Sequence, residues 1–368
     1  MSKAEKNRMC VGVDLHKTQF TVCALDEGTG TVELECEFRT NADGYEDFIS
    51  RMHEIESERG NSIELAVEST GNARFFKNKM EYEGFRVVVV NTNKFKVITM
   101  STKKNDANDA ATLAFYLLKE MLPESHLCDQ TSEEIRRMLK TRSILVQATV
   151  KMKNQIHGMM LGYGIETKSA QLQSKKKRQE LYKDLANHNF SEFTTSSLKV
   201  ILDILDDLQK QIKTIEGQLQ KMVEDNDNVE LLKTMPGIGQ IGAITIAAYT
   251  NDMSRFDGDF KRFASYLGIV PSVRDSNQTV RRGKITKHGP QELRTAFVQV
   301  AMGIIRQPQN TSEWKLMIDY HRMKKEKGSG RAIIALTRKV ARIVFVMLSK
   351  QKEFNPALMI REKTKLTA

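Results

Sequence analysis

The segment MCVGVDL, residues 9–15, carries one acid in an otherwise apolar run, and that acid is Asp14. A charged side chain inside a strand is costly unless it is paired or binds a metal. Two more segments with strand character follow at residues 20–25 and 32–38, and residues 26–30, DEGTG, have turn chemistry between them. Together these segments predict an antiparallel meander of three strands.

Helix and strand signals alternate beyond the meander. Residues 63–68 predict a fourth strand, and the β-branched run at residues 87–90 predicts a buried fifth one. The predicted helices cover residues 44–58, 72–83 and 106–120. This order, βββ-α-β-α-β-α, is that of an RNase H-like fold, in which helices cover a mixed sheet. We therefore predict an α/β domain of this class over residues 9–125.

Four acids stand where this topology can gather them. Asp14 lies on the first strand and Glu68 ends the fourth, and these two strands are neighbours in an RNase H-like sheet. Asp106 and Asp109 are three residues apart on a helix, so they share a face. Converging carboxylates repel one another unless divalent cations neutralise them, and hard oxygen ligands suit Mg²⁺ or Mn²⁺. Two such ions, on the order of 4 Å apart, suit phosphoryl transfer.

Each acid also has a simpler interpretation. Asp14 alone fits a strand-end cap, and Glu68 alone fits a solvated strand end. Asp106 and Asp109 alone fit a solvated helix N-terminus that complements the helix dipole. Their combination on these elements, in this order, favours the metal site.

The middle of the chain has a heptad period. Its apolar positions are Leu198, Ile201, Leu205, Leu208, Ile212, Ile215, Leu219 and Met222, which is a strong coiled-coil pattern. Residues 135–159 repeat the rhythm less regularly, Thr131 and Glu134 fit a capping box, and the Lys-rich residues 174–178 fit a loop or linker. We predict an antiparallel helical hairpin within residues 131–229, which could pair internally or with another chain.

Residues 230–350 predict a compact, mainly helical domain. Its predicted helices cover residues 256–267, 291–305 and 331–348. The remaining residues, 351–368, are polar, and we expect a poorly ordered tail.

The segment MPGIG, residues 235–239, precedes the apolar residues 241–249 and resembles a helix-hairpin-helix turn. In such a turn, Gly237 and Gly239 would let the backbone approach a phosphate, and free N–H groups at the helix start would hold it. A glycine-rich turn without any ligand fits the same residues equally well.

Residues 271–289 are basic and rich in turn residues, and they contain Ser276 and a single acid, Asp275. A serine hydroxyl near several cations is a plausible nucleophile toward a phosphodiester, and a phosphoserine would conserve the energy of the bond. A serine in a basic loop more often contacts a phosphate or lies in a turn. The cations that this segment offers to nucleic acid are Arg274, Arg281, Arg282, Lys284 and Lys287.

The composition restricts the classes of partner. The net charge of +11 suits a polyanion, although a merely basic soluble protein fits it as well. The four cysteines form no C-x-x-C pair and the seven histidines show no H-x-x-x-H spacing, so we expect reduced thiols and no zinc site. We see no signal peptide and no apolar run near the roughly 20 residues of a membrane helix, so we expect a cytoplasmic protein without a membrane partner.

Five motifs together resemble one protein family. They are VGVDLHK at residues 11–17, AVESTG at 66–71, KNDANDA at 104–110, MPGIG at 235–239, and PSVRDSN with RRGKITKHG at 271–277 and 281–289. In this order they resemble the DEDD-type transposases of the IS110 and IS1111 insertion sequences, relatives of the Piv DNA invertase. The resemblance covers about residues 10–350.

The resemblance implies a metal-dependent recombinase with a RuvC-like catalytic domain and a C-terminal transposase domain. The implied metal ligands are Asp14, Glu68, Asp106 and Asp109. The implied nucleophile is Ser276, although many relatives carry Ser-Ser-Gly where this chain has Asp-Ser-Asn, and Ser272 is the less favoured alternative. The implied partners are element and target DNA, a bridge RNA transcribed from the element, and further copies of the chain. Those copies would form a dimer or tetramer that shares active sites, at the nucleoid of a bacterium.

Three alternatives stay open. The same fold with water as nucleophile would be a RuvC-like junction endonuclease, but the basic segment around Ser276 and the second domain argue against it. A Piv-like DNA invertase fits the same residues as a transposase. A non-catalytic nucleic-acid-binding or regulatory protein is of another class, and four intact acids argue against it.

Overall fold

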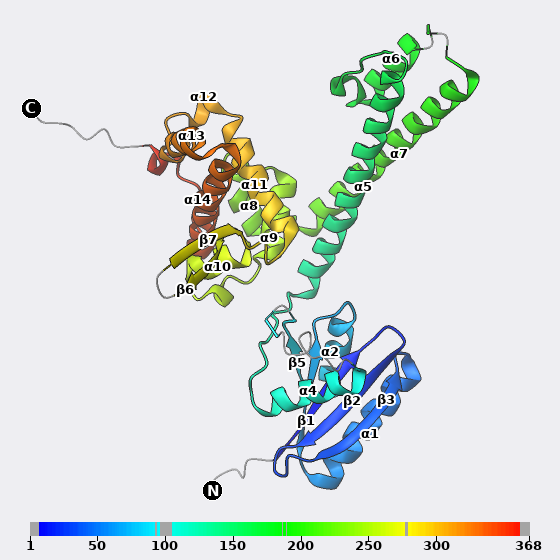
Figure 1. The fold of residues 1–368 in the computed structure, drawn as a ribbon, viewed down its shortest axis with the longest axis vertical. Helices are drawn as coiled ribbons and strands as arrows, with labels where there is room; N and C mark the ends of the chain where they lie inside the picture. The colour runs from blue at the N-terminus through cyan, green and yellow to red at the C-terminus, as the bar shows by residue number, and fades with distance from the viewer. Residues whose placement is uncertain are drawn as a thin grey trace, which may run out of the picture. The chain divides into compact units, whose positions relative to one another are not determined.

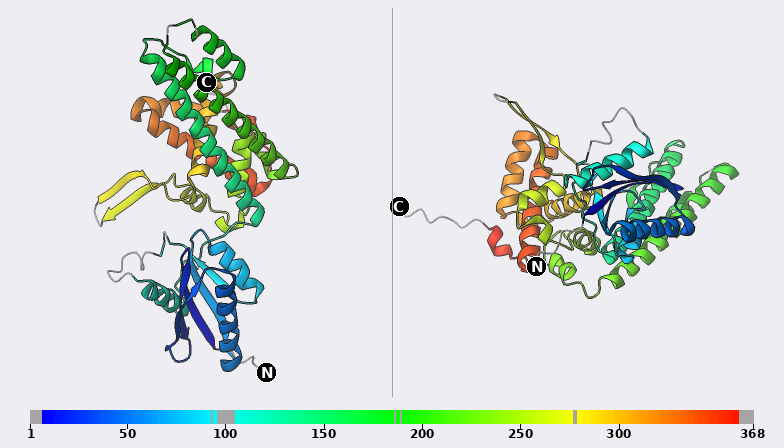
Figure 2. Two further views of the ribbon diagram at one scale, coloured as in Figure 1. Left: turned by 90° about the vertical axis from the view of Figure 1, so that its right-hand side faces the viewer. Right: turned by 90° about the horizontal axis from the view of Figure 1, so that it is seen from below.

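The computed structural model of the chain describes residues 7–92, 94–95, 105–185, 187–188, 190–276 and 279–360, with the backbone alone for residues 274–276 and 279–282. The chain divides into two compact units, Met1–Leu127 and Cys128–Ala368. Figure 1 and Figure 2 show the elements of each unit. Among the described residues, we find no helix long and apolar enough to cross a membrane.

The first unit is built on a five-stranded sheet with the strand order β3-β2-β1-β4-β5. The strands are β1 (Arg8–Leu15), β2 (Gln19–Asp26), β3 (Val32–Arg39), β4 (Ser62–Glu68) and β5 (Arg86–Val90). The first three form the predicted antiparallel meander, and β1 pairs with β4, and β4 with β5, in parallel. The predicted element order and the mixed sheet are therefore confirmed for the described residues.

Helices cover both faces of this sheet (Figure 2). Helices α1 (Ala42–Arg59) and α2 (Ala73–Tyr82) pack on one face, where Phe20, Phe48 and Phe76 are fully buried. Helix α4 (Asp106–Leu118) packs on the other face, against alternate residues of β1, β4 and β5. Because side chains alternate along a strand, each central strand sends one set of residues toward each helical layer.

The second unit begins with a long pair of helices, α5 (Gln130–Leu161) and α7 (Glu192–Met222). Ile135 near the start of α5 shares a core with Leu219 near the end of α7, whereas Ile156 shares a core with Leu198. The two helices are therefore antiparallel, as predicted, and the heptad positions all lie within α7. Short helices η1 (Ser169–Leu172) and α6 (Lys175–Leu185) pack at the far end of the pair.

Two details of this helical pair differ from the prediction. Residues 175–178 belong to α6 and are not part of a linker, because the side chain of Arg178 is buried and pairs with Asp206 of α7. The N-terminal cap of α5 is Asp129, whose carboxylate accepts a hydrogen bond from the backbone N–H of Ser132 at 2.8 Å. The predicted Thr131–Glu134 capping box was therefore wrong, and the helix begins two residues earlier.

The rest of the second unit is mainly helical, as predicted, and packs around α14 (Ser329–Lys350). The other helices are α8 (Asp227–Lys233), α9 (Gln240–Tyr249), η2 (Ser254–Phe256), α10 (Phe260–Tyr266), α11 (Gln291–Ile305), α12 (Pro308–Thr311), α13 (Lys315–Lys327) and η3 (Pro356–Met359). The first turns of α5 and the end of α7 join the same hydrophobic core through Leu139 and Val223.

Three predictions for this region need correction. The helix expected at residues 256–267 is broken, because Asp257 and Gly258 adopt positive φ angles of 48° and 67°. The basic segment expected to be a loop is an antiparallel hairpin of β6 (Pro271–Ser276) and β7 (Thr279–Ile285). The tail is ordered up to residue 360, because the ring of Phe354 contacts that of Trp314 at a tilted angle and Ile360 forms a β-bridge with Trp314. Residues 361–368 lie outside the described part.

Candidate active site

Asp14 and Glu68 lie at the same edge of the sheet in the first unit, where the carboxyl ends of the central strands β1 and β4 meet. Strands β1 and β4 are parallel and Val13 pairs with Val67, so each acid stands one residue beyond a paired position. Both acids belong to the alternate set that includes Gly12 and faces α4. The prediction that the first and fourth strands are neighbours is therefore confirmed, and these two acids share an edge and a face.

The first turn of α4 brings Asp106 and Asp109 to this edge. Asn105 caps the helix, and its side-chain oxygen accepts a hydrogen bond from the N–H of Asn108 at 2.8 Å. The close approach of α4 to β1 depends on Gly12, because a Cβ there would lie 2.0 Å from the carbonyl oxygen of Ala110. Because Gly12 has no side chain, α4 can approach β1 closely, and this approach sets the distance from Asp106 and Asp109 to the acids on the strands.

His16 lies among these acids, although the sequence patterns did not single it out as a site residue. Its Nε2 is 3.1 Å from Oδ2 of Asp14 and 3.5 Å from Oδ1 of Asp106. Thr40 and Asn72 each donate a side-chain hydrogen bond to the carbonyl oxygen of His16 at 3.2 Å, which holds the loop after β1. Its place in the VGVDLHK motif, two residues after Asp14, is the sequence feature that could have identified His16 as a site residue.

Burial and mutual repulsion act on the acids of this edge. Burial raises the pKa of Asp14, the nearby His16 opposes this shift, and the charges of Asp106 and Asp109 add to it. Burial also raises the pKa of Glu68, and the charges of Asp14 and Asp109 raise it further. All four predicted acids are therefore close enough to interact, and each gains from a neighbouring positive charge.

The donor set suits a hard divalent cation. Asp14, His16 and Asp106 each offer one ligand atom, and these three atoms lie within 4.8 Å of one another. Carboxylate oxygens are the ligands that Mg²⁺ and Mn²⁺ prefer in proteins. The residues of this edge thus fit the metal that the acids imply, with Asp14 and Asp106 as its oxygen donors.

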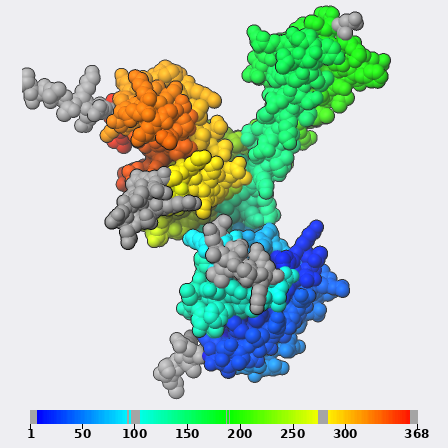
Figure 3. Space-filling view, viewed as in Figure 1, coloured from blue at the N-terminus to red at the C-terminus, as the bar shows by residue number. Residues whose placement is uncertain are grey.

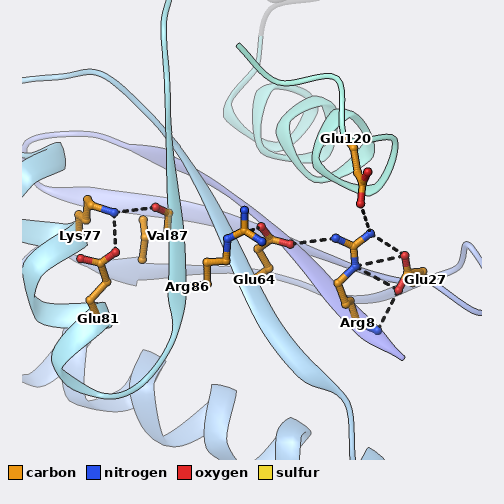
Figure 4. Close-up of polar contacts among 8 residues, drawn as sticks. All are labelled: Arg8, Glu27, Glu64, Lys77, Glu81, Arg86, Val87 and Glu120. Carbon is orange, nitrogen blue, oxygen red and sulfur yellow. Dashed lines mark hydrogen bonds and ion pairs between the residues drawn. The ribbon is translucent and has the colours of Figure 1, made fainter. Parts of the chain in front are cut away.

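The opposite edge of the same sheet also carries a buried acid, but with different neighbours. Glu64 of β4 pairs with Arg8 at 3.3 Å and with Arg86 at 3.2 Å (Figure 4). Arg8 reaches two further carboxylates, those of Glu27 and Glu120, at 2.7 and 3.0 Å. Because guanidinium groups already neutralise these acids, this edge forms a structural ion-pair network.

The MPGIG turn of the second unit joins α8 to α9. Gly237 has a φ of +90°, and a Cβ there would lie 2.9 Å from the carbonyl oxygen of Val300 on α11. Gly237 is therefore required by packing. Gly239 caps α9 without a side-chain hydrogen bond and has open space around it, beside a cavity of about 630 Å³ that Lys140 and Arg142 also line.

The β6–β7 hairpin carries Ser276 at its end, where the residue pairs with Thr279. Arg274 pairs in register with Arg281, and Val273 with Arg282, so the predicted basic residues lie on both strands. The side chains of these arginines and of Ser276 lie outside the described part. Lys284 and Lys287 are exposed, at the end of β7 and in the turn after it.

Comparisons with known proteins bear directly on these two units. A family model for DEDD transposases of the IS110 type matches residues 11–165, and one described as the transposase IS116/IS110/IS902 family matches residues 229–315. The transposase of insertion sequence element IS1111A from Coxiella burnetii is 23% identical over 96% of this chain and 93% of its own length. The chain belongs to the IS110 family of DEDD transposases.

Further members of this family align with most of the chain. A probable family 20 transposase from Pseudomonas aeruginosa is 22% identical over 94% of this chain and 98% of its own length. The transposase of element IS1328 from Yersinia enterocolitica is 25% identical over 79% of this chain and 85% of its own length. The resemblance inferred from the five motifs is thus confirmed. The first matched range contains the four acids and His16, and the second contains the MPGIG turn and the β6–β7 hairpin.

A second basic surface of this transposase was not predicted. The last turn of α13 carries Lys324, Lys325 and Lys327, and Arg331 lies in the first turn of α14, which begins at Ser329. All four side chains are exposed, and α13 lies on the surface of the orange region in Figure 3. A cluster of exposed cations without many acids among them suits the backbone of a nucleic acid.

Proposed function

We propose that this transposase cuts and rejoins the DNA of a bacterial insertion sequence by metal-assisted attack of a serine on a phosphodiester. The first unit would be an RNase H-like (RuvC-like) catalytic domain, residues 9–125. The coiled-coil hairpin of residues 131–229 and the C-terminal transposase domain of residues 230–350 would follow, with residues 351–368 as a tail. The observation that carries the proposal is the gathering of four acids at one sheet edge in a member of a DEDD transposase family.

The acids would hold one or two Mg²⁺ or Mn²⁺ ions. When bound, such an ion supplies Lewis acidity to phosphate oxygens during phosphoryl transfer. Asp14 and Glu68 are fixed by the sheet, whereas Asp106 and Asp109 are fixed by the capped start of α4. Because the side chain of Asp14 is only 14% exposed, little water competes with a ligand at its carboxylate.

Ser276 would supply the nucleophile. Its hydroxyl would lose its proton and form an oxygen–phosphorus bond as the bond from phosphorus to a DNA oxygen breaks, and the departing DNA oxygen would take up a proton to become a hydroxyl. A DNA hydroxyl could then attack the phosphoserine, restore a phosphodiester and release the serine. The bond energy is kept in the phosphoserine, so rejoining requires no nucleotide cofactor.

Nucleic-acid binding would use several basic surfaces. The net charge of +11, the hairpin cations and the α13–α14 cluster support binding of element and target DNA together with a bridge RNA. Gly239 would bring the start of α9 close to a phosphate. We further propose that copies of the chain assemble as a dimer or tetramer at the nucleoid, in the cytoplasm.

The test is a denaturing gel of the full chain with element-junction DNA, RNA transcribed from the element, and Mg²⁺. We expect a covalent protein–DNA adduct with the wild type and with the control Ser272→Ala, and none with Ser276→Ala. An adduct that is lost in Ser272→Ala and kept in Ser276→Ala would move the nucleophile to Ser272.

The other outcomes identify the alternatives. Free cleaved ends from both wild type and Ser276→Ala would mean a RuvC-like junction endonuclease that uses water. Binding without any cleavage by the wild type would mean a non-catalytic nucleic-acid-binding protein. An adduct followed by inversion of a segment between two sites, without insertion into a new target, would mean a Piv-like invertase.

A further inference from the structure

The imidazole of His16 occupies a position in the acidic edge that the four acids do not explain. We propose that His16 is itself a ligand of the divalent cation in this transposase, which makes the centre a mixed nitrogen–oxygen site that favours Mn²⁺ over Mg²⁺. This inference rests on the proposed metal site and adds one ligand and a metal preference to it.

The imidazole of His16 is hydrogen-bonded to Asp14, and the spacing of these atoms is also that of neighbouring metal ligands. Its Nε2 lies 3.1 Å from Oδ2 of Asp14 and 3.5 Å from Oδ1 of Asp106. Ligands bound at about 2.1 Å to one ion are about 3 Å apart when they are adjacent on it. The three atoms together span no more than 4.8 Å, so one ion can reach all of them with small side-chain movements.

The loop that carries His16 is held by its backbone and not by the imidazole. The N–H of His16 donates to the carbonyl oxygen of Gln19 at 3.0 Å, and its own carbonyl accepts from Thr40 and Asn72. The imidazole is 50% exposed, so it does not serve as packing for the core. A side chain that is aimed at two carboxylates by a fixed loop, without a packing role, is suited to binding a ligand.

The nature of the donor sets the preferred ion. Mg²⁺ binds oxygen ligands almost exclusively and keeps much of its water, whereas transition-metal ions accept imidazole nitrogen readily. A site of carboxylates alone would bind the two ions similarly. Replacing one oxygen ligand by an imidazole therefore shifts the preference toward Mn²⁺.

The experiment is pulsed electron paramagnetic resonance on Mn²⁺ bound to the full chain, together with equilibrium titrations of Mn²⁺ and Mg²⁺. We expect coupling of bound Mn²⁺ to a ¹⁴N nucleus in the wild type and in the control His321→Ala, whose exposed histidine lies on α13. His16→Ala should lose this coupling. Its Kd for Mn²⁺ should rise about tenfold or more, whereas its Kd for Mg²⁺ should change less than about threefold.

The outcomes separate this inference from the proposed function. Mn²⁺ that binds the wild type without nitrogen coupling, and whose binding is lost in Asp14→Asn, would overturn the role of His16 and leave the acidic metal site intact. Mn²⁺ binding that survives unchanged in Asp14→Asn would overturn the metal site itself. His16→Ala should melt at the wild-type temperature without metal, because the imidazole is half exposed and the backbone holds the loop.

Discussion

At two opposite edges of the sheet in the first unit, the two ends of the central strands, acids are fully or partly buried. The side chains that surround these acids differ in charge between the two edges. At one edge Glu64 lies between Arg8 and Arg86, so its charge is neutralised within the chain. At the other edge, partial burial and the nearby charge of Asp109 raise the pKa of both Asp14 and Glu68. Burial alone therefore does not identify a functional acid; the charge of its neighbours does.

Glu64 and Glu68 allow the two edges to be compared on one strand. They lie four residues apart on β4, at positions of the same parity, so they point to the same face of the sheet. They have the same side chain, but Glu64 is buried within the strand beside two guanidinium groups, whereas Glu68 ends the strand, is only partly buried and lies near other acids. Glu64 is therefore suited to stabilising the fold through its ion pairs, and Glu68 is suited to binding a cation from solution.

The largest effect should come from exchanging each of these glutamates for glutamine. Glu68→Gln should lower DNA cleavage by on the order of 10³-fold or more, because it removes a carboxylate from the proposed metal site, with little change in stability. Glu64→Gln should keep cleavage and lower the free energy of unfolding by about 2 kcal/mol, because it removes the carboxylate beside Arg86 and one of the three carboxylates around Arg8.

Cleavage assays and denaturant unfolding of the two full-length variants check this pair of outcomes. The stability loss expected for Glu64→Gln is smaller than for a fully buried pair, because the side chain of Arg86 is 72% exposed. Equal losses of stability and activity in both variants would erase the distinction between the two edges.

A second prediction concerns the distance between the strands and α4. Gly12→Ala should push α4 away from β1, because the new Cβ would overlap the carbonyl oxygen of Ala110 and the backbone nitrogen of Ala114. We expect a loss of about 1–3 kcal/mol in the free energy of unfolding. Since α4 carries Asp106 and Asp109, Mn²⁺ affinity should fall as well, although no acid has been changed.

The matched control is Gly158→Ala on α5, where an added Cβ meets nothing within 4 Å. That variant should keep wild-type metal affinity and be as stable as the wild type or slightly more so, since alanine favours a helix over glycine. Wild-type metal affinity in Gly12→Ala would mean that the position of α4 does not control the site.

The same physical distinction explains what could be predicted from the sequence. Asp14 was recognisable because it interrupts an apolar strand, and Asp106 and Asp109 because their spacing places them on one face of a helix. The order of strands and helices along the chain follows from periodicities that depend only on neighbouring residues in sequence, and the pairing of the first strand with the fourth follows from the RNase H-like topology that this order matches. The meander and the sharing of an edge by Asp14 and Glu68 were therefore predictable.

His16, α6 and the β6–β7 hairpin were not predictable in this way, because each depends on partners distant in sequence. His16 has no periodic signal, and its placement needs Thr40 and Asn72. The Lys-rich start of α6 has linker composition, and only the buried pair of Arg178 with Asp206 shows why it folds. Residues 271–285 are polar and basic along both strands, so no alternation of apolar residues marked the hairpin.

The smallest expected effect concerns stability and pH at the acidic edge. The pKa values of Asp14 and Glu68 are raised above their ordinary values of 3.8 and 4.5, chiefly by burial, and for Glu68 next by neighbouring acids. The folded chain therefore holds these protons more tightly than the unfolded chain. As the pH rises from about 4 through these raised pKa values, the two acids ionise and the free energy of unfolding of the wild type falls. A variant that cannot ionise at these two positions does not lose this stability.

In EDTA, the double variant Asp14→Asn, Glu68→Gln should therefore melt above the wild type at pH 7, and the difference should close as the pH falls toward 4. Adding Mn²⁺ at pH 7 should raise the melting temperature of the wild type and not that of the double variant, because only ionised carboxylates bind the ion. Glu64→Gln should respond to Mn²⁺ as the wild type does. A melting difference that is the same at pH 4 and pH 7 would mean that the two acids already have partners within the folded chain, as Glu64 has, and the contrast between the two edges would then fail.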